Sequence, residues 1–274
     1  MRADERRVFA VLGDPIAHSR SPAMQGAAFA ALGLPHVYVA LRVSPADLPV
    51  ALAGARALGF GGLNLTVPHK RAAVGAMDAL GPAARRIGAV NTVAIEGGRL
   101  CGENTDSPGF ALALGELGAA PRRAIVLGAG GASAAVIDAL LGEVGAEDVR
   151  WVSRTPAAIE GPEDGRLRRI GYEELAGAPL AAELLVNCTT VGMHGGATRF
   201  PVELDLGSLA GGAAVVDIVY PRPPGGLLDQ ADALGLRTQD GREMLLWQGV
   251  LALSRWLGRS IPGEVVAAMR AALG

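Results

Sequence analysis

The chain has 274 residues, a formal net charge of −2, and a composition that is 50% hydrophobic but only 4% aromatic. This length and apolar content suit one large or two ordinary domains with mainly aliphatic cores, and the charge offers no electrostatic basis for binding nucleic acid or an acidic membrane. Two cysteines, Cys101 and Cys188, exclude a disulfide-rich secreted framework and favour reduced thiols in the cytoplasm.

A first α/β unit is predicted for about the first hundred residues, where short apolar runs alternate with helical stretches. Strands are expected at residues 8–12, 36–43 and 61–67, and helices are expected to open at the Ser-Pro pairs 21–22 and 44–45. This alternation is typical of a sheet rich in parallel strands. Before the first helix, Ser19 and Ser21 offer two hydroxyls that suit a ligand carboxylate; plain helix capping is the other explanation, and it accounts better for Ser21 alone than for both.

The third strand runs into a polar cluster, Asn64-Leu-Thr66-Val-Pro68-His-Lys70. Asn64 and Thr66 fall on the same side of an extended strand, and both capping of the strand end and ligand binding explain them. Pro68 ends the strand and leaves Lys70 in the loop or first helical turn beyond it. Lys70 is the only lysine among 25 basic residues, and a lysine, unlike an arginine, can lose its proton near neutral pH.

A second polar cluster contains Asn91 and then Asn104-Thr-Asp106, which precedes a Ser-Pro pair. An Asp in this position can simply cap a helix. Alternatively, an ionised Asp106 near Lys70 would form an acid/base pair. Oxidation of a secondary alcohol requires such chemistry, because a group must accept the hydroxyl proton as hydride leaves the same carbon.

A second α/β unit is predicted after Pro121, with strands at 123–127 and 148–152. Between them lie the glycine-rich turn Gly128-Ala-Gly-Gly-Ala-Ser133 and a helix to about Leu141. In a mononucleotide-binding fold, the first glycine lets the strand turn sharply and the second lets the backbone approach a pyrophosphate; the small third residue lets helix and strand pack closely. The glycines also argue against a membrane-spanning helix here.

Cofactor choice is expected to depend on Ser153-Arg154-Thr155, at the end of the following strand. An NAD site normally has an acidic residue here for the ribose 2′-hydroxyl, and none is present. A guanidinium can instead hold a 2′-phosphate through two parallel hydrogen bonds. The alternative is that Arg154 is an ordinary surface arginine. Together with the glycine turn, its position favours a role in binding NADP.

The rest of the chain continues the α/β pattern without an internal repeat or a low-complexity linker. Further strands are expected at 184–187 and 213–218, and helical sequence at 244–256 and 262–273 closes the chain. We expect no metal site.

With these clusters in view, the chain resembles the shikimate dehydrogenase family over nearly its full length. Seven segments carry the resemblance in order: residues 13–22, 64–70, 88–92, 104–106, 128–133, 187–193 and 244–248. The resemblance implies a two-domain α/β fold, with a substrate (shikimate-binding) domain of residues 1–103 plus 243–274, to which the C-terminal helices return, and a Rossmann-type NADP-binding domain of residues 104–242. It also implies the NADP-dependent, reversible reduction of 3-dehydroshikimate to shikimate in chorismate and aromatic amino acid biosynthesis.

The resemblance further implies roles for individual residues. Lys70 and Asp106 correspond to the catalytic pair, and Ser19 and Ser21 to the site of the substrate carboxylate. The residues implied to line the substrate ring and its hydroxyls are Thr66, Asn91, Tyr220 and Gln248. The residues implied to bind the cofactor are Gly128, Ala129, Gly130, Gly131, Ala132 and Ser133 in the turn, Ser153, Arg154 and Thr155 around the 2′-phosphate, Thr189 and Met193 near the nicotinamide, and Gly241 in a loop that approaches it.

Three positions depart from the family pattern. Gln25-Gly26 stand where the family usually has His-Asn, and Ser153 replaces the commoner Asn, so that one adenosine contact need not form here. The stretch 221–226 after Tyr220 lacks the usual Thr before Leu-Leu, and the conformation of this loop is expected to differ from that in the family. None of these departures affects Lys70 or Asp106.

Two alternatives remain open. A quinate or dual-specificity quinate/shikimate dehydrogenase would bind a substrate with an extra hydroxyl at the carboxylate-bearing carbon; in the family a threonine at the position of Ser21 tends to accompany quinate use, so Ser21 favours shikimate. A ligand sensor without turnover is the second alternative, and Lys70, Asp106 and the nucleotide turn argue against it. The expected partners are small molecules, with neither nucleic acid nor membrane, and the protein is expected to be a monomer or homodimer.

Overall fold

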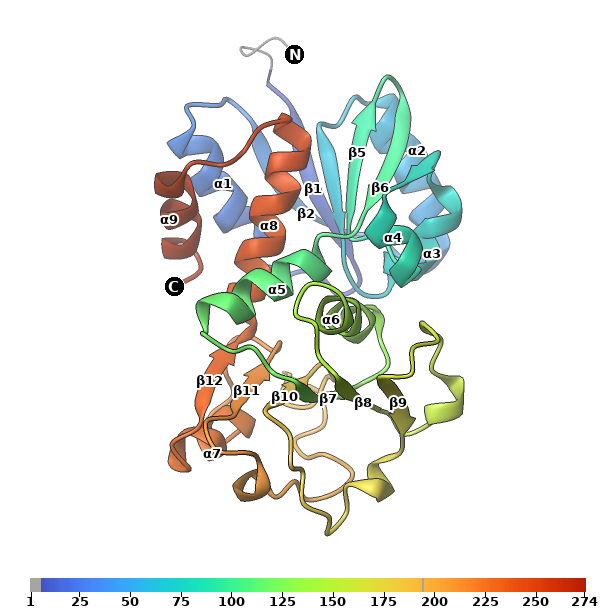
Figure 1. The fold of residues 1–274 in the computed structure, drawn as a ribbon. Coiled ribbons are helices and arrows are strands. Elements are labelled where there is room, and N and C mark those ends of the chain that lie inside the picture. Colours follow the sequence, from blue (N-terminus) through green and yellow to red (C-terminus); the bar gives the residue numbers. More distant parts are fainter. Residues whose placement is uncertain (1–5, 194) are drawn as a thin grey trace. The chain divides into compact units, whose positions relative to one another are not determined.

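The computed structural model describes residues 6–193 and 195–274, and it divides the chain into two compact α/β units (Figure 1). One unit comprises Met1–Gly109, of which residues 1–5 are not described, together with Leu245–Gly274, and the other comprises Phe110–Met244. The chain leaves the first unit within α5 (Asp106–Glu116) and returns within α8 (Gly241–Leu257). Both crossing points lie a few residues after the boundaries expected from the sequence.

The first unit is built on a six-stranded sheet with the order β2-β1-β3-β5-β6-β4. Its strands are β1 (Val8–Gly13), β2 (Val37–Arg42), β3 (Gly62–Leu65), β4 (Ala79–Leu80), β5 (Thr92–Glu96) and β6 (Arg99–Glu103). β1 pairs in parallel with β2 and β3, as the predicted alternation requires. β5 pairs antiparallel with both β3 and β6, so the sheet is mixed and not parallel throughout.

The antiparallel half of this sheet has a local cause in the β5–β6 hairpin. Gly97 and Gly98 connect the two strands, and both have positive φ, 56° and 76°. A two-residue turn with φ above zero at both positions matches the twist of the flanking strands, and it is too short for the crossover that parallel strands need.

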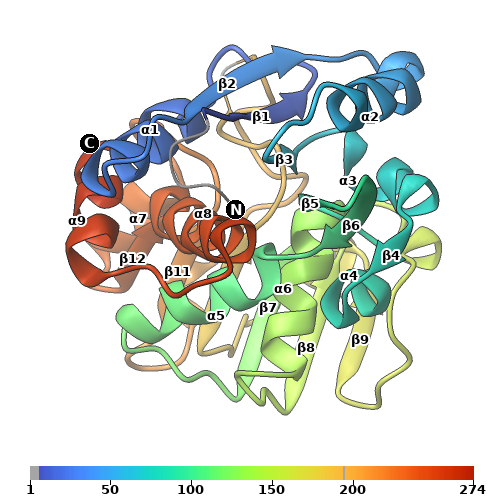
Figure 2. The same cartoon turned by 90° about the horizontal axis from the view of Figure 1, so that it is seen from above.

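Helices cover both faces of the first sheet, as Figures 1 and 2 show. The helices on one face are α1 (Ser21–Ala31), α8 and α9 (Gly263–Ala271), and those on the other are α2 (Leu48–Ala57), α3 (His69–Ala72) and α4 (Pro82–Ile87), with the short 3₁₀ segments η1 (Pro45–Asp47) and η2 (Ala73–Ala76) beside them. In β1, Phe9 and Val11 face the α1 side, and Ala10 and Leu12 face the α2 side. Because both faces are buried, β1 is apolar throughout.

The second unit has an all-parallel sheet with the order β12-β11-β10-β7-β8-β9. Its elements are β7 (Arg123–Leu127), α6 (Gly131–Leu141), β8 (Asp148–Val152), η3 (Pro156–Ala158), β9 (Leu167–Ile170), η4 (Tyr172–Glu174), β10 (Leu184–Asn187), η5 (Leu206–Ser208), β11 (Ala214–Asp217), α7 (Leu227–Ala233) and β12 (Arg237–Asp240). The chain runs outward from β7 to β9 and then returns to β10, on the other side of β7. This reversal is the switch point of a doubly wound nucleotide-binding fold.

Among the helices of the described residues, none combines the length and the hydropathy that a membrane span requires.

Candidate active site

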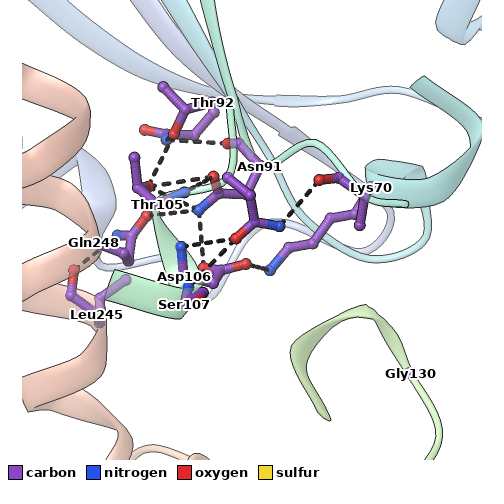
Figure 3. A network of polar contacts seen from close by, with 12 residues as sticks. Lys70, Asn91, Thr92, Thr105, Asp106, Ser107, Gly130, Leu245 and Gln248 are labelled. Atoms are coloured by element: carbon purple, nitrogen blue, oxygen red, sulfur yellow. Dashed lines mark hydrogen bonds and ion pairs between the residues drawn. The ribbon is translucent and has the colours of Figure 1, made fainter. Parts of the chain in front are cut away.

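Lys70 and Asp106 meet in the first unit. Lys70 lies in the single turn of α3, shortly after β3, and Asp106 is the first residue of α5. The Lys70 Nζ donates a hydrogen bond to the Asp106 Oδ2 over 2.7 Å (Figure 3), and the two side chains are 16% and 6% exposed. The structure thus joins the two side chains that the sequence singled out, in a place where a small ligand can still reach the ammonium group.

Asn104, and not Asp106, caps helix α5. The Asn104 Oδ1 accepts hydrogen bonds from the backbone N–H groups of Asp106 (3.1 Å) and Ser107 (3.3 Å), while its Nδ2 donates to the Ala89 carbonyl over 3.0 Å. Because Asn104 fills the capping role, the Asp106 carboxylate remains available for Lys70. The explanation of Asp106 as a plain helix cap is therefore wrong.

Asn91 holds the second carboxylate oxygen of Asp106. Its Nδ2 donates to the Asp106 Oδ1 over 2.8 Å and lies 3.4 Å from the Gln248 Oε1 on α8. The Gln248 Nε2 donates to the Leu245 carbonyl over 2.7 Å, which turns the Gln248 oxygen toward Asn91. The Val90 N–H, one residue before Asn91, donates to the Lys70 carbonyl over 2.8 Å. Lys70 and Asn91 therefore each bind one oxygen of the Asp106 carboxylate, and Gln248 contacts Asn91 in turn.

Simple helix capping does not explain the two serines of the first loop, Ser19 and Ser21. Helix α1 begins at Ser21 itself, so that Arg20, and not Ser21, stands at the N-cap position, without a side-chain cap. The Ser19 Oγ accepts a hydrogen bond from the Ser21 N–H over 3.3 Å, and Ser21 is 6% exposed. Ser21 is therefore not the capping residue, and the capping explanation does not account for its hydroxyl.

Thr66 lies beyond β3, which ends at Leu65 and is shorter than the sequence predicted. Asn64 stays within the strand and is 6% exposed, whereas Thr66 lies in the connection to α3, where its carbonyl accepts from the His69 N–H over 2.8 Å. A Cβ on Gly13 would come within 2.5 Å of the Thr66 Cγ2, so the backbone passes close to this side chain.

The glycine-rich turn of the second unit has the geometry that a phosphate site requires. Gly128 has a φ of +109°, and a Cβ there would lie 2.9 Å from the Cys188 carbonyl oxygen, so that only glycine fits. Helix α6 begins at Gly131 after Gly130, and the N–H groups of its first turn have no acceptor within the helix. Ser133 is fully buried and its Oγ donates to the Gly130 carbonyl over 2.8 Å. Exposed N–H groups at the positive end of a helix suit a pyrophosphate.

The predicted 2′-phosphate site directly follows β8. Ser153 is buried, and its Oγ accepts from the Thr155 N–H over 3.2 Å. Arg154 is exposed, and within the described ranges no carboxylate pairs with its guanidinium group. This arginine is therefore available for an anionic ligand.

The loop after β10 carries Thr189 and Met193 and is held by Asn187. The Asn187 Oδ1 accepts from the Thr189 N–H (3.0 Å) and hydroxyl (2.7 Å), while its Nδ2 donates to the Asp217 Oδ1 over 2.9 Å. Met193 is 39% exposed. Burial raises the pKa of Asp217 to about 6, against the lowering effect of its hydrogen bonds from Val219 and Asn187. Asp217 was not predicted from the sequence, although its signal is one acid at the end of the otherwise apolar strand β11 (Ala214–Asp217).

Gly241 and Tyr220 lie near the end of β11. A Cβ on Gly241 would fall 2.1 Å from the Ile218 carbonyl oxygen, so the first residue of α8 must be glycine. Tyr220 is half-buried and follows β11 by three residues. The stretch 221–226 is anchored to α7, because Arg222 pairs with Asp229 and Asp232 there.

Comparison with known proteins identifies the family of the chain. Residues 11–93 match the family model for the shikimate dehydrogenase substrate binding domain, and residues 241–273 match that for the shikimate 5′-dehydrogenase C-terminal domain. The shikimate dehydrogenases (NADP(+)) of Symbiobacterium thermophilum and Rubrobacter xylanophilus are 43% and 45% identical, with 95% and 98% of this chain and 92% and 96% of theirs covered. A shikimate 5-dehydrogenase from Thermus thermophilus, solved in complex with NADP(H) and shikimate, is 41% identical with a TM-score of 0.81, and the match covers 97% of this chain and 99% of that one. The chain therefore belongs to the shikimate dehydrogenase family.

Proposed function

We propose that this protein catalyses the NADP-dependent, reversible reduction of 3-dehydroshikimate to shikimate, a step in chorismate and aromatic amino acid biosynthesis. The observation that carries the proposal is the Lys70–Asp106 contact of 2.7 Å, with Asn91 on the second carboxylate oxygen. Relatives with 43% and 45% identity over nearly the whole chain have the same named activity. The protein would act in the cytoplasm on small molecules alone, as a monomer or homodimer.

Lys70 is proposed to handle the proton. When bound, NADPH supplies the hydride to the carbonyl carbon of the substrate. The Lys70 ammonium gives a proton to the carbonyl oxygen and recovers it in the reverse reaction. Asp106 holds the Nζ of Lys70 in place and accepts a hydrogen bond from it throughout. Asn91 limits the rotation of the Asp106 carboxylate through its bond to the Oδ1.

The remaining substrate contacts are proposed from the family pattern and the positions of these residues. Ser19 and Ser21, at the start of α1, would bind the substrate carboxylate. Residues from several elements would bind the ring hydroxyls: Thr66, Asn91, Tyr220 and Gln248. Hydroxyl and amide groups of this kind both donate and accept, which suits a polyhydroxy acid.

The second unit is proposed to bind NADP. The fit is supported by the turn itself, where a side chain at Gly128 would collide with backbone and the first N–H groups of α6 lack acceptors. Arg154 would pair with the 2′-phosphate, with Ser153 and Thr155 beside it. Thr189, Met193 and Gly241 would lie near the nicotinamide.

The decisive experiment assays the purified protein with shikimate and with quinate, each against NADP and NAD. We expect the highest kcat/KM for shikimate with NADP. Comparable turnover of quinate would show a dual-specificity enzyme. Tight binding of shikimate without turnover under any of the four conditions would show a ligand sensor and refute the proposed reaction.

A further inference from the structure

A continuous line of buried side chains leads away from Asp106 into the sheet of the first unit (Figure 3). Beyond Asn91, the line continues through Thr105, whose Oγ1 lies 3.2 Å from the Asn91 Oδ1 and 3.0 Å from the Thr92 Oγ1. Thr92, Thr105 and Asn91 are 0%, 6% and 2% exposed. Water cannot readily replace a partner lost from groups this deeply buried.

The line then crosses to two more strands. The Asn64 Nδ2 on β3 donates to the Thr92 Oγ1 over 3.1 Å, and the Tyr38 hydroxyl on β2 lies 2.7 Å from the Asn64 Oδ1. Both Asn64 and Tyr38 are 6% exposed. We call this set the Tyr38–Asp106 line; its members in order are Tyr38, Asn64, Thr92, Thr105, Asn91 and Asp106.

Two backbone groups determine which way the two asparagine amides of the line face. The Thr105 N–H, which can only donate, bonds the Asn91 Oδ1 over 2.8 Å, so the amide nitrogen of Asn91 must face Asp106. The Asn91 carbonyl, which can only accept, bonds the Asn64 Nδ2 over 3.1 Å, so the amide oxygen of Asn64 must face Tyr38. Tyr38 is therefore the donor to Asn64.

The two threonine hydroxyls connect these two amides. The Thr92 Oγ1 accepts from Asn64 and lies 3.0 Å from the Thr105 Oγ1, where either hydroxyl can be the donor. The Thr105 Oγ1 in turn lies 3.2 Å from the Asn91 Oδ1 and 3.0 Å from the Asn91 Nδ2. The hydrogen bonds from Tyr38 to the Asn91 amide are therefore continuous, and the groups of such a network polarise one another.

We propose that Tyr38, Asn64 and Thr92 are positioning residues, whose hydrogen-bonded line holds the Asn91 amide with its nitrogen toward the Asp106 carboxylate. They touch neither substrate nor cofactor in this proposal and act only through Asn91 and Asp106. Because the line begins on strands, it ties the orientation of the site to the sheet. The inference rests on the proposed function, since it requires Asp106 to matter for turnover.

The test compares Thr92→Val, which keeps the shape of the side chain but removes its hydroxyl, with Thr92→Ser, which keeps the hydroxyl. Thr92→Val should lower kcat about tenfold or more while changing the shikimate KM much less, because a buried donor and acceptor both lose their partner. Thr92→Ser should retain most of the wild-type kcat. Tyr38→Phe removes one oxygen, keeps the ring packing and should lower kcat about threefold. It is the second test of the inference and replaces Thr92→Val if that variant does not fold.

Val93→Ala is the matched control. Val93 neighbours Thr92 on β5 and is fully buried, but it packs in the apolar cluster on the other side of the strand. It should lower the Tm while leaving kcat within about twofold of wild type, because only packing is lost.

Two results would overturn the inference. One is a Thr92→Val kcat that falls no further than that of Val93→Ala at a similar loss of Tm, and the other is a raised KM with unchanged kcat. If wild-type protein turns over shikimate and Lys70→Ala abolishes turnover while Thr92→Val is silent, the proposed function stands and only this inference fails.

Discussion

Replacing Lys70 with alanine should remove proton transfer while leaving most substrate contacts in place. The change deletes the ammonium group that lies 2.7 Å from the Asp106 Oδ2. A positioned acid or base is worth about 10²–10⁴-fold, so kcat should fall by that factor, or about 2.7–5.4 kcal/mol of activation free energy. The shikimate KM should change little, because the proposed carboxylate and hydroxyl contacts remain.

The same variant should also lose stability, and the structure sets the size of the loss. The Asp106 side chain is 6% exposed and would keep Asn91 as a hydrogen-bond donor but lose its cationic partner. Because Lys70 itself is 16% exposed, water can partly replace it, and we expect a loss of about 1–3 kcal/mol. Adding Asp106→Asn to Lys70→Ala removes the unpaired charge, so the double variant should recover stability without recovering kcat.

Lys70→Arg separates proton transfer from charge. A guanidinium remains protonated at any working pH, so this variant should keep less than about a tenth of the wild-type kcat. The assay follows NADPH formation over a range of pH, with thermal unfolding of each variant measured in parallel. If Lys70→Arg retains more than about a tenth of kcat, a fixed positive charge is sufficient, and proton transfer must be reassigned to Asp106 or to water.

Three further variants test the remaining assignments. Arg154→Ala should raise the KM for NADP about tenfold or more and leave the NAD kinetics nearly unchanged in steady-state assays, since charge-assisted bonds to a phosphate are worth about 1.5–3 kcal/mol each. Ser19→Ala and Ser21→Ala should each raise the shikimate KM more than they lower kcat, because contacts remote from the reacting carbon bind ground state and transition state alike. Asp217→Asn should raise the free energy of unfolding above pH 6 by up to about 3 kcal/mol in urea titrations, because it removes a buried charge.

The pH dependence for Asp217 follows from the direction of its shift. Burial raises its pKa from 3.8 to about 6, so between these values the folded protein holds a proton that the unfolded chain has released. The stabilising contribution is therefore complete below about pH 4 and is lost as the pH rises through about 6. The gain in the free energy of unfolding of Asp217→Asn over wild type should increase between about pH 4 and pH 6 and then stay constant. A gain independent of pH would contradict the argument.

Contrary results for the other two sites are equally specific. Equal losses with NADP and NAD in Arg154→Ala would show that Arg154 is structural. A change in kcat alone for Ser19→Ala or Ser21→Ala would place those hydroxyls at the reacting carbon.

The predicted secondary structure was most accurate for strands buried on both faces. The expected strands at 123–127, 148–152 and 184–187 coincide with β7, β8 and β10. β7 and β10 are almost wholly buried and read as nearly continuous apolar runs, while β8 keeps the apolar residues Val149, Trp151 and Val152 between its polar ones. β9 and β12 were not predicted. They occupy the two edges of the sheet, where their sequences, Leu-Arg-Arg-Ile and Arg-Thr-Gln-Asp, carry polar side chains in place of an apolar run.

The β5–β6 hairpin was also missed, although a signal was present. Gly97-Gly98 between two short runs is typical of a two-residue hairpin turn. The expectation of a parallel-rich sheet, drawn from the first three strands, did not extend to this region of the chain.

The sequence by itself determined the family, the two α/β units and the residues proposed to handle protons and phosphates, because each motif is a short run of neighbouring residues. Only the tertiary structure decided how these groups pair. The contacts of Lys70 with Asp106, Tyr38 with Asn64, and Asn91 with Gln248 join residues 36, 26 and 157 positions apart. The orientation of the Asn64 and Asn91 amides depends on the Asn91 carbonyl and the Thr105 N–H, which lie 27 and 14 positions away in the chain, and no local pattern encodes such partners. For that reason the capping role of Asn104 and the Tyr38–Asp106 line could be recognised only from the tertiary structure.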